Sequence, residues 1–112
     1  MVRDLNDQGV EDRVLGVEGP VAVAFLDYDS LPCHHFRPEL EAVSEQMEGK
    51  VDFYRIDVTE NPWITEELGV EAVPTLLVFR EGKEIARYEG PYSREALGDR
   101  LAQLLAGPKP QA

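Results

Sequence analysis

The sequence predicts an α/β domain, a three-layer α/β/α sandwich around a central mixed sheet. Residues Val21–Leu26 are apolar throughout, the pattern of a central strand that is covered on both faces. Strand-like and amphipathic helical segments alternate along the chain in the order β-α-β-α-β-α-β-β-α, which is typical of α/β folds. The last two strands are so close together that we expect them to form an antiparallel hairpin.

The first segments of the chain favour an edge strand and a capped helix. Residues 2–5 have the composition of a short edge strand. Asn6 or Asp7 is then expected to cap a helix that runs to about Leu15, with Val10, Val14 and Leu15 on its apolar face. Residues 16–20 contain glycine and proline and form a break before the central strand.

A long amphipathic helix is predicted after the central strand, from Pro32 to about Glu48. Its apolar residues recur at helical spacing, as an inward-facing stripe should: Phe36, Leu40, Val43 and Met47. Pro38 lies inside this helix, removes a backbone donor and is expected to kink it. The only cysteine, Cys33, falls on the first turn.

The second half of the chain supplies three strands and two helices, expected at residues 51–58, 62–69, 75–79, 84–88 and 93–106. Asn61 is expected to cap the shorter helix, and Ser93 the longer one. We predict one domain over residues 1–106, followed by a flexible tail at residues 107–112.

The composition limits the function. The net charge of −11 opposes binding to nucleic acid or to an anionic membrane, since both would repel this chain. The sequence contains no apolar run of about 20 residues and no secretory signal, so we expect a cytoplasmic protein. A single cysteine excludes an internal disulfide and any multi-cysteine metal site within one chain. We expect no cofactor and a monomer or weak dimer.

Four stretches give the sequence its resemblance to thioredoxin over nearly its whole length. They are Pro20–Phe25, Ser30–Pro38, Asp57–Pro62 and Gly69–Phe79, the last followed by Gly82. The second stretch resembles the family's Cys-Gly-Pro-Cys motif with its downstream proline. The resemblance implies the thioredoxin fold.

The resemblance also implies a groove that holds a partner polypeptide beside Pro74. Val73–Pro74 would be a cis peptide, and the backbone of Ala72 and Val73 would pair with an extended segment. Gly90 would form another wall of the groove. Asp29, Leu31 and Pro32 would contact the partner from the motif side.

The chemistry departs from the family pattern. The family's attacking cysteine is replaced by Ser30, whose hydroxyl cannot perform thiol exchange. The tryptophan that usually precedes it is Asp29, the buried aspartate falls at Ala24, and a nearby lysine falls at Arg55. A two-cysteine reductase is therefore not expected from this chain alone.

Two functional hypotheses follow from this pattern. The first is a binding or redox-accessory module that keeps the groove but performs no dithiol–disulfide turnover. The alternative is a monothiol oxidoreductase or thiol sensor that uses Cys33 in cell redox homeostasis. The helix terminus and His34 favour a thiolate at Cys33, whereas Asp27 and Asp29 oppose it, so the sequence leaves the reactivity open.

Two other chemistries are suggested by residues near Cys33. His34 and His35 are potential metal ligands, but consecutive helical residues point about 100° apart and do not converge on one ion. Asp29, Ser30 and His34 contain the residue types of a hydrolase triad, without any evident oxyanion hole. A simpler role for Ser30 is to cap the helix by accepting a hydrogen bond from the Cys33 amide. We expect no metal.

Overall fold

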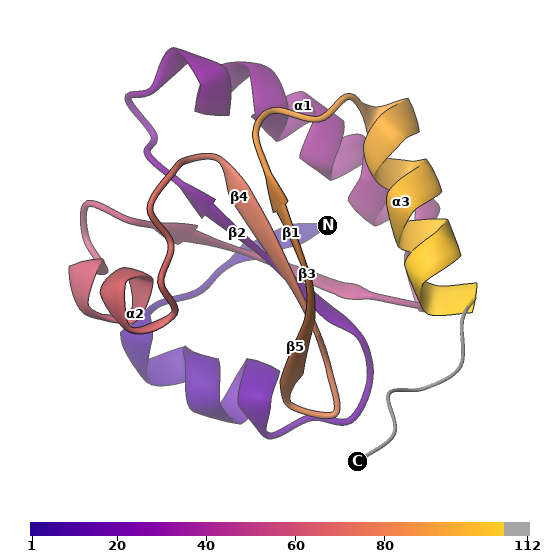
Figure 1. The fold of residues 1–112 in the computed structure, drawn as a ribbon, viewed down its shortest axis with the longest axis horizontal. Helices are drawn as coiled ribbons and strands as arrows, with labels where there is room; N and C mark the ends of the chain where they lie inside the picture. Colours follow the sequence, from indigo (N-terminus) through magenta and orange to yellow (C-terminus); the bar gives the residue numbers. More distant parts are fainter. Residues whose placement is uncertain (107–112) are drawn as a thin grey trace.

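Five strands form one mixed sheet in the computed structural model, which describes residues 1–106 (Figure 1). The strands are β1 (Val2–Asp4), β2 (Val21–Leu26), β3 (Asp52–Asp57), β4 (Thr75–Arg80) and β5 (Lys83–Glu89), in the spatial order β1-β3-β2-β4-β5. β3 runs parallel to both β1 and β2, whereas β4 runs antiparallel to both β2 and β5. The predicted mixed sheet and terminal hairpin are confirmed.

Helices cover both faces of this sheet (Figure 1). The helical segments are η1 (Asp7–Gly9), η2 (Glu11–Leu15), α1 (Leu31–Gln46), α2 (Pro62–Glu67) and α3 (Arg94–Ala106). α1 and α3 pack against each other on one face, and η1, η2 and α2 lie on the other. The α/β sandwich predicted from the sequence is therefore the observed architecture.

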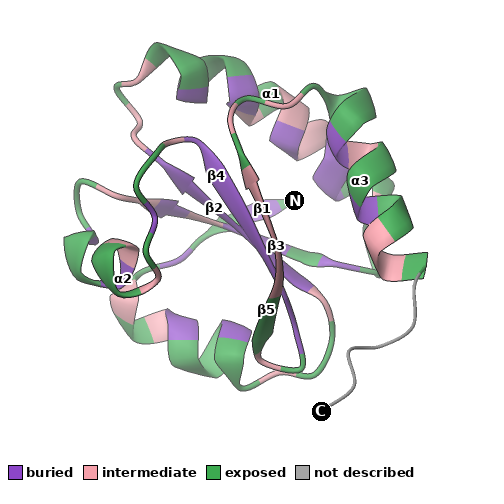
Figure 2. Cartoon of the chain, viewed as in Figure 1, coloured by how far each residue is buried: buried purple, intermediate pink, exposed green. Residues whose placement is uncertain are grey.

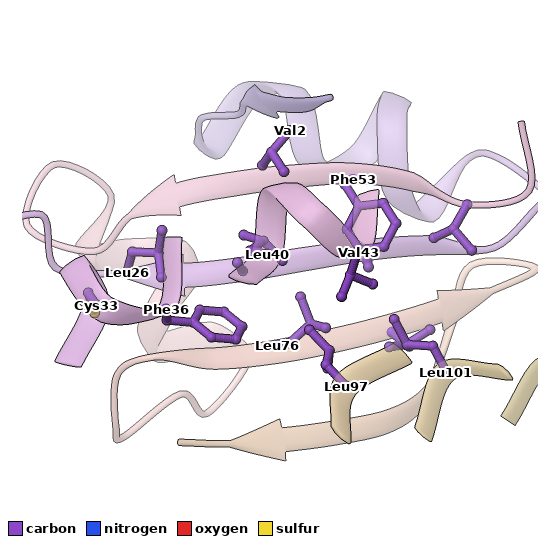
Figure 3. Close-up of a cluster of buried hydrophobic side chains, with 14 residues drawn as sticks. Val2, Leu26, Cys33, Phe36, Leu40, Val43, Phe53, Leu76, Leu97 and Leu101 are labelled. Carbon is purple, nitrogen blue, oxygen red and sulfur yellow. The ribbon is translucent and has the colours of Figure 1, made fainter. Parts of the chain in front are cut away.

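β2 contributes to a separate apolar core on each face, because successive side chains of a strand point to opposite sides. Ala22, Ala24 and Leu26 face the core under α1 and α3, with Cys33 and Phe36 (Figure 3). The alternate residues of β2 face the core under α2 and the N-terminal helical segment. All six residues of β2 are buried (Figure 2), as the uninterrupted apolar run predicts.

The N-terminal helix differs from the prediction. Asn6 is the cap, since its side-chain oxygen accepts hydrogen bonds from the Gln8 and Gly9 amides. The segment then divides into a 3₁₀ turn and a π turn, the latter closed by a 2.8 Å bond from the Gly16 amide to the Glu11 carbonyl. Val10 and Val14 are buried, whereas Leu15 is exposed, so Leu15 does not belong to the apolar face predicted for this segment.

The cap predicted at α2 is also wrong in its detail. Asn61 occupies the cap position but makes no side-chain bond to the helix. Its amide instead donates to the Asp57 carbonyl and its side-chain oxygen accepts from the Asp7 amide, at 3.0 and 3.1 Å. Asn61 therefore joins η1 to the loop before α2. The Ser93 cap is confirmed by a 3.2 Å bond from the Ala96 amide.

Two further points concern the limits of the described chain. The predicted tail at residues 107–112 lies outside the described residues. Within residues 1–106, every helix is too short or too polar to cross a membrane.

Candidate functional site

The loops that carry the predicted site residues lie together at one end of the sheet, where β2 and β3 end and β4 begins (Figure 1). Leu26 at the end of β2 pairs with Asp57 at the end of β3. Thr75 at the start of β4 pairs with Phe25 on one side and with Glu89 on the other. The segments just beyond these strand ends are therefore neighbours, namely residues 27–30, 58–61, 71–74 and 90.

Cys33 lies in the interior beneath these loops and not at the surface. Its side chain is 0% exposed and points into the core formed with Leu26 and Phe36 (Figure 3). The Asp27 amide donates a hydrogen bond to Cys33 Sγ at 3.4 Å. The sulfur thus holds the turn that joins β2 to α1.

The predicted Ser30 cap is wrong in its side-chain role. Ser30 stands at the cap position in an extended conformation, but its hydroxyl makes no capping bond. The turn is closed by backbone groups instead, since the Ser30 amide donates to the Asp27 carbonyl and the His34 amide donates to the Ser30 carbonyl, both at 3.0 Å. The hydroxyl is therefore not needed to begin the helix, and Ser30 remains partly exposed.

The surface above Cys33 is formed by residues of the turn and of the first turn of α1. Asp29 and Pro32 are exposed, and Leu31 is 65% exposed. His34 and His35 are also exposed. Among residues 1–106, no group of three or more His, Cys, Asp or Glu side chains is placed to hold a metal ion.

The segment around Pro74 is the neighbour of this turn across the end of the sheet. The Val73–Pro74 peptide is cis, the Pro74 carbonyl accepts a 2.9 Å bond from the Gly90 amide, and Thr75 Oγ1 donates to the Ala72 carbonyl at 2.6 Å. Val73 packs its side chain against the core that contains Cys33. The backbone amide and carbonyl of Val73 make no hydrogen bond within the described part of the chain. The structure thus places Gly90 beside the segment Ala72–Pro74.

A cluster of aromatic and charged side chains, missed by the sequence analysis, joins the turn at residues 27–30 to β1 and β3. Tyr28 donates to Asp4 Oδ1 at 3.1 Å, and Arg55 Nε donates to the same oxygen at 2.7 Å. The Arg37 and Arg55 guanidinium groups lie 4.9 and 5.9 Å from the centroid of the Tyr28 ring. The pairing of β1 with β3 could have indicated this cluster, because it places Asp4 opposite Arg55.

These contacts change the pKa values of Asp4 and Tyr28. The hydrogen bond from Arg55 is the largest effect and lowers the pKa of Asp4; burial opposes it, and the bond from Tyr28 lowers the pKa by a smaller amount. Burial raises the pKa of Tyr28, and its bond to Asp4 raises it further. Asp4 is therefore held charged and Tyr28 neutral, which preserves the donor and the acceptor of their bond.

Arg87 was also missed, and no sequence pattern pointed to it. It extends from β5 to the end of α2, where it donates to the Leu68 and Gly69 carbonyls at 2.7 and 2.8 Å. Glu84 holds the same guanidinium through bonds of 2.9 and 3.0 Å. Arg87 thereby fixes the loop after α2 to the sheet.

Trp63, on α2, is 66% exposed.

The comparisons with known proteins agree with this fold. A protein-family model described as "Thioredoxin" matches residues 1–103. A thioredoxin of Synechocystis sp. is 30% identical over 101 residues, which cover 90% of this chain and 94% of that protein. A thioredoxin of Rickettsia bellii is 29% identical over 97 residues, covering 87% and 92%. The crystal structure of chloroplastic thioredoxin z superposes with a TM-score of 0.85 at 29% identity, covering 95% of this chain and 96% of that one.

Proposed function

The chain belongs to the thioredoxin family, and we propose that it is a polypeptide-binding member that performs no dithiol–disulfide turnover. The partner segment lies in an extended conformation between the turn at residues 29–32 and the wall formed by Ala72, Val73, Pro74 and Gly90. Its backbone pairs with the free amide and carbonyl of Val73, in the manner of an added strand.

The observation that carries the proposal is the burial of the only cysteine. Disulfide exchange requires a thiolate that can approach a substrate sulfur, and Cys33 Sγ is fully buried and receives the Asp27 amide. The position three residues earlier holds Ser30. The segments proposed to form the groove lie at one end of the sheet, while the attacking sulfur is replaced by a hydroxyl; this combination supports binding over turnover.

The monothiol alternative is the second candidate, since family membership favours a role in cell redox homeostasis. It requires Cys33 to become accessible, because a buried sulfur cannot form a mixed disulfide. The burial of Cys33 makes this the weaker candidate. A reactive Cys33 in the folded protein would favour it over the binding module.

The class of partner in the proposed function agrees with the charge. With a net charge of −11, the protein is proposed to act on polypeptides and not on nucleic acid or membranes, and the proposed compartment is the cytoplasm. It needs no cofactor for this role, and it acts as a monomer or weak dimer.

The first experiment measures disulfide reduction. Insulin reduction by dithiothreitol is followed with and without the protein, and we expect the wild type to add nothing to the rate. The matched variant Ser30→Cys restores a Cys-x-x-Cys motif at the start of α1 and is expected to accelerate reduction. Acceleration by the wild type would overturn the proposal.

The second experiment measures binding. Peptides selected from a random display library on the wild-type protein are scanned by N-methylation, which removes one backbone donor at a time. Strand pairing predicts that methylation weakens binding only at the residue opposite Val73, with shifts in the Val73 and Gly90 amide NMR signals. No selected peptide, or an effect at every position alike, would contradict the groove.

A further inference from the structure

We propose that the partner is a basic segment that places one apolar side chain in a cavity beside the groove. The cavity measures about 450 Å³ and lies between α2 and the loop that leads to Pro74. Val58, Pro62, Val70 and Val73 form its apolar walls, with Glu66 and Glu71 at its rim. The inference rests on the proposed function, because Val73 belongs to both the cavity and the groove.

The cavity opens at the surface and is held open by the fold. Pro62, Glu66 and Glu71 are exposed, whereas Val70 is buried. The Arg87 bonds to the Leu68 and Gly69 carbonyls fix the loop on which Val70 lies. A preformed apolar cavity of this kind binds an apolar side chain without first paying for rearrangement of the loop.

The negative charge around the cavity favours basic residues next to the apolar anchor of the partner segment. Neither Glu66 nor Glu71 takes part in an ion pair within residues 1–106. The hydrogen bond that Arg87 donates to Glu84 is the main cause of the raised pKa of Arg87, and Glu71 contributes only a smaller electrostatic effect. The rim therefore keeps negative charge that is not neutralised, and it complements lysine or arginine next to the apolar anchor.

The turn at residues 27–30, on the other side of the proposed groove, also carries negative charge. Asp29 is exposed, and Asp27 is partly exposed. A partner that crosses from this turn to the cavity thus meets carboxylates at both ends of its path. An acidic segment would be repelled along the same path, and so would a second copy of this chain with its charge of −11.

The test uses four capped Ser/Gly peptides whose central residues are Lys-Leu-Lys, Lys-Ala-Lys, Glu-Leu-Glu or Ser-Leu-Ser. Binding is followed by NMR through the methyl signals of Val58 and Val70 for the cavity and through the Val73 and Gly90 amides for the groove. We expect Lys-Leu-Lys to bind at least about tenfold more tightly than Lys-Ala-Lys, which lacks the buried leucine. We expect Glu-Leu-Glu to bind about tenfold more weakly than Lys-Leu-Lys at low salt, and about 0.5 M salt to reduce that difference.

Two protein variants separate charge from apolar contact. The double change Glu66→Gln with Glu71→Gln should weaken Lys-Leu-Lys about fivefold or more and leave Ser-Leu-Ser unchanged. The matched control, Glu95→Gln with Asp99→Asn, makes the same change in net charge on exposed residues of α3 and should weaken neither. Thr65→Phe fills the cavity and should weaken both peptides, with its folding checked by urea denaturation.

The readouts distinguish the two proposals. If peptides shift the Val73 and Gly90 amides but show no dependence on Glu66, Glu71 or the leucine, this inference is overturned while the proposed function stands. If no peptide shifts those amides, the proposed function fails as well. Cavity shifts that appear on raising the protein concentration without peptide would assign the cavity to a second copy and overturn the basic partner.

Discussion

At the scale of single residues, Cys33 acts as a packing residue. Because its sulfur is fully buried and accepts the Asp27 amide, alkylation requires the turn above it to open. We expect iodoacetamide to label Cys33 in the native protein at least about a hundredfold more slowly than in urea. The rate is measured by mass spectrometry at constant pH.

A thiol one turn away provides the control for this prediction. In the double variant Ser30→Cys with Cys33→Ala, the only thiol stands at a partly exposed position. This thiol should react in the native protein at a rate close to that of the unfolded chain. Equal protection at both positions would mean that burial of Cys33 is not what limits its labelling.

Asp4 gives a pH-dependent prediction. The bond from Arg55 lowers its pKa in the folded protein, so the stabilisation is complete above the unfolded pKa of about 3.9 and is lost as the pH falls through the folded value. Asp4→Asn should cost about 0.5 kcal/mol at pH 7, a value reduced for solvent screening because the side chain is 73% exposed. The cost should vanish at about pH 2, as measured by urea unfolding.

The control for Asp4 is an exposed carboxylate at the other end of the neighbouring strand β3. Asp52 lies 4.0 Å from Arg3, and both side chains are exposed. Asp52→Asn should change the free energy of unfolding by a few tenths of a kcal/mol at most. If both variants behave alike, the Tyr28 and Arg55 contacts add nothing to the stability of the turn.

At the scale of elements, Arg87 connects β5 to α2. Arg87→Ala removes the two bonds to the Leu68 and Gly69 carbonyls and the pair with Glu84. We expect a loss of about 1–2 kcal/mol in the free energy of unfolding and faster hydrogen exchange in α2. Lys83→Ala, an exposed change on the same strand, should alter neither measurement.

Elements with strong periodicity could be predicted, and those held by tertiary contacts could not. The apolar run of β2 and the stripe of α1 each define one burial pattern, and both were located correctly. The N-terminal helix was expected to be continuous because its 3₁₀ and π turns use the same residue types as an α-helix. Asn61 was expected to cap α2, since the sequence does not reveal the competing bonds to Asp57 and Asp7.

At the scale of the whole molecule, the charge of −11 gives a prediction about salt. Like charges repel each other in the compact state, and added salt screens them. Raising NaCl from about 0.02 to 0.5 M should raise Tm by a few degrees at pH 7. Near pH 4.5, the isoelectric point, the net charge vanishes and the shift should be much smaller. A shift of the same size at both pH values would point to preferential hydration rather than screening.

The candidate site was partly predictable at the same scale. Ser30, Cys33, Ala72, Val73, Pro74 and Gly90 were located through the family resemblance, and their grouping at one edge of the sheet follows from the strand order. The burial of Cys33 could not be read from the sequence, because it depends on how α1 is placed on the sheet. Arg87 and the cavity depend on contacts between residues far apart in the chain, which leave no local pattern.

β2 takes part in both apolar cores, which has a consequence for cooperativity. Neither core can lose its order while the other keeps it, because each loses half of the side chains of the same strand. We therefore expect a single unfolding transition, with β2 amides among the last to exchange. The turn at residues 27–30 begins where this strand ends, so the proposed recognition surface is attached to the segment that we expect to be among the most protected in the molecule.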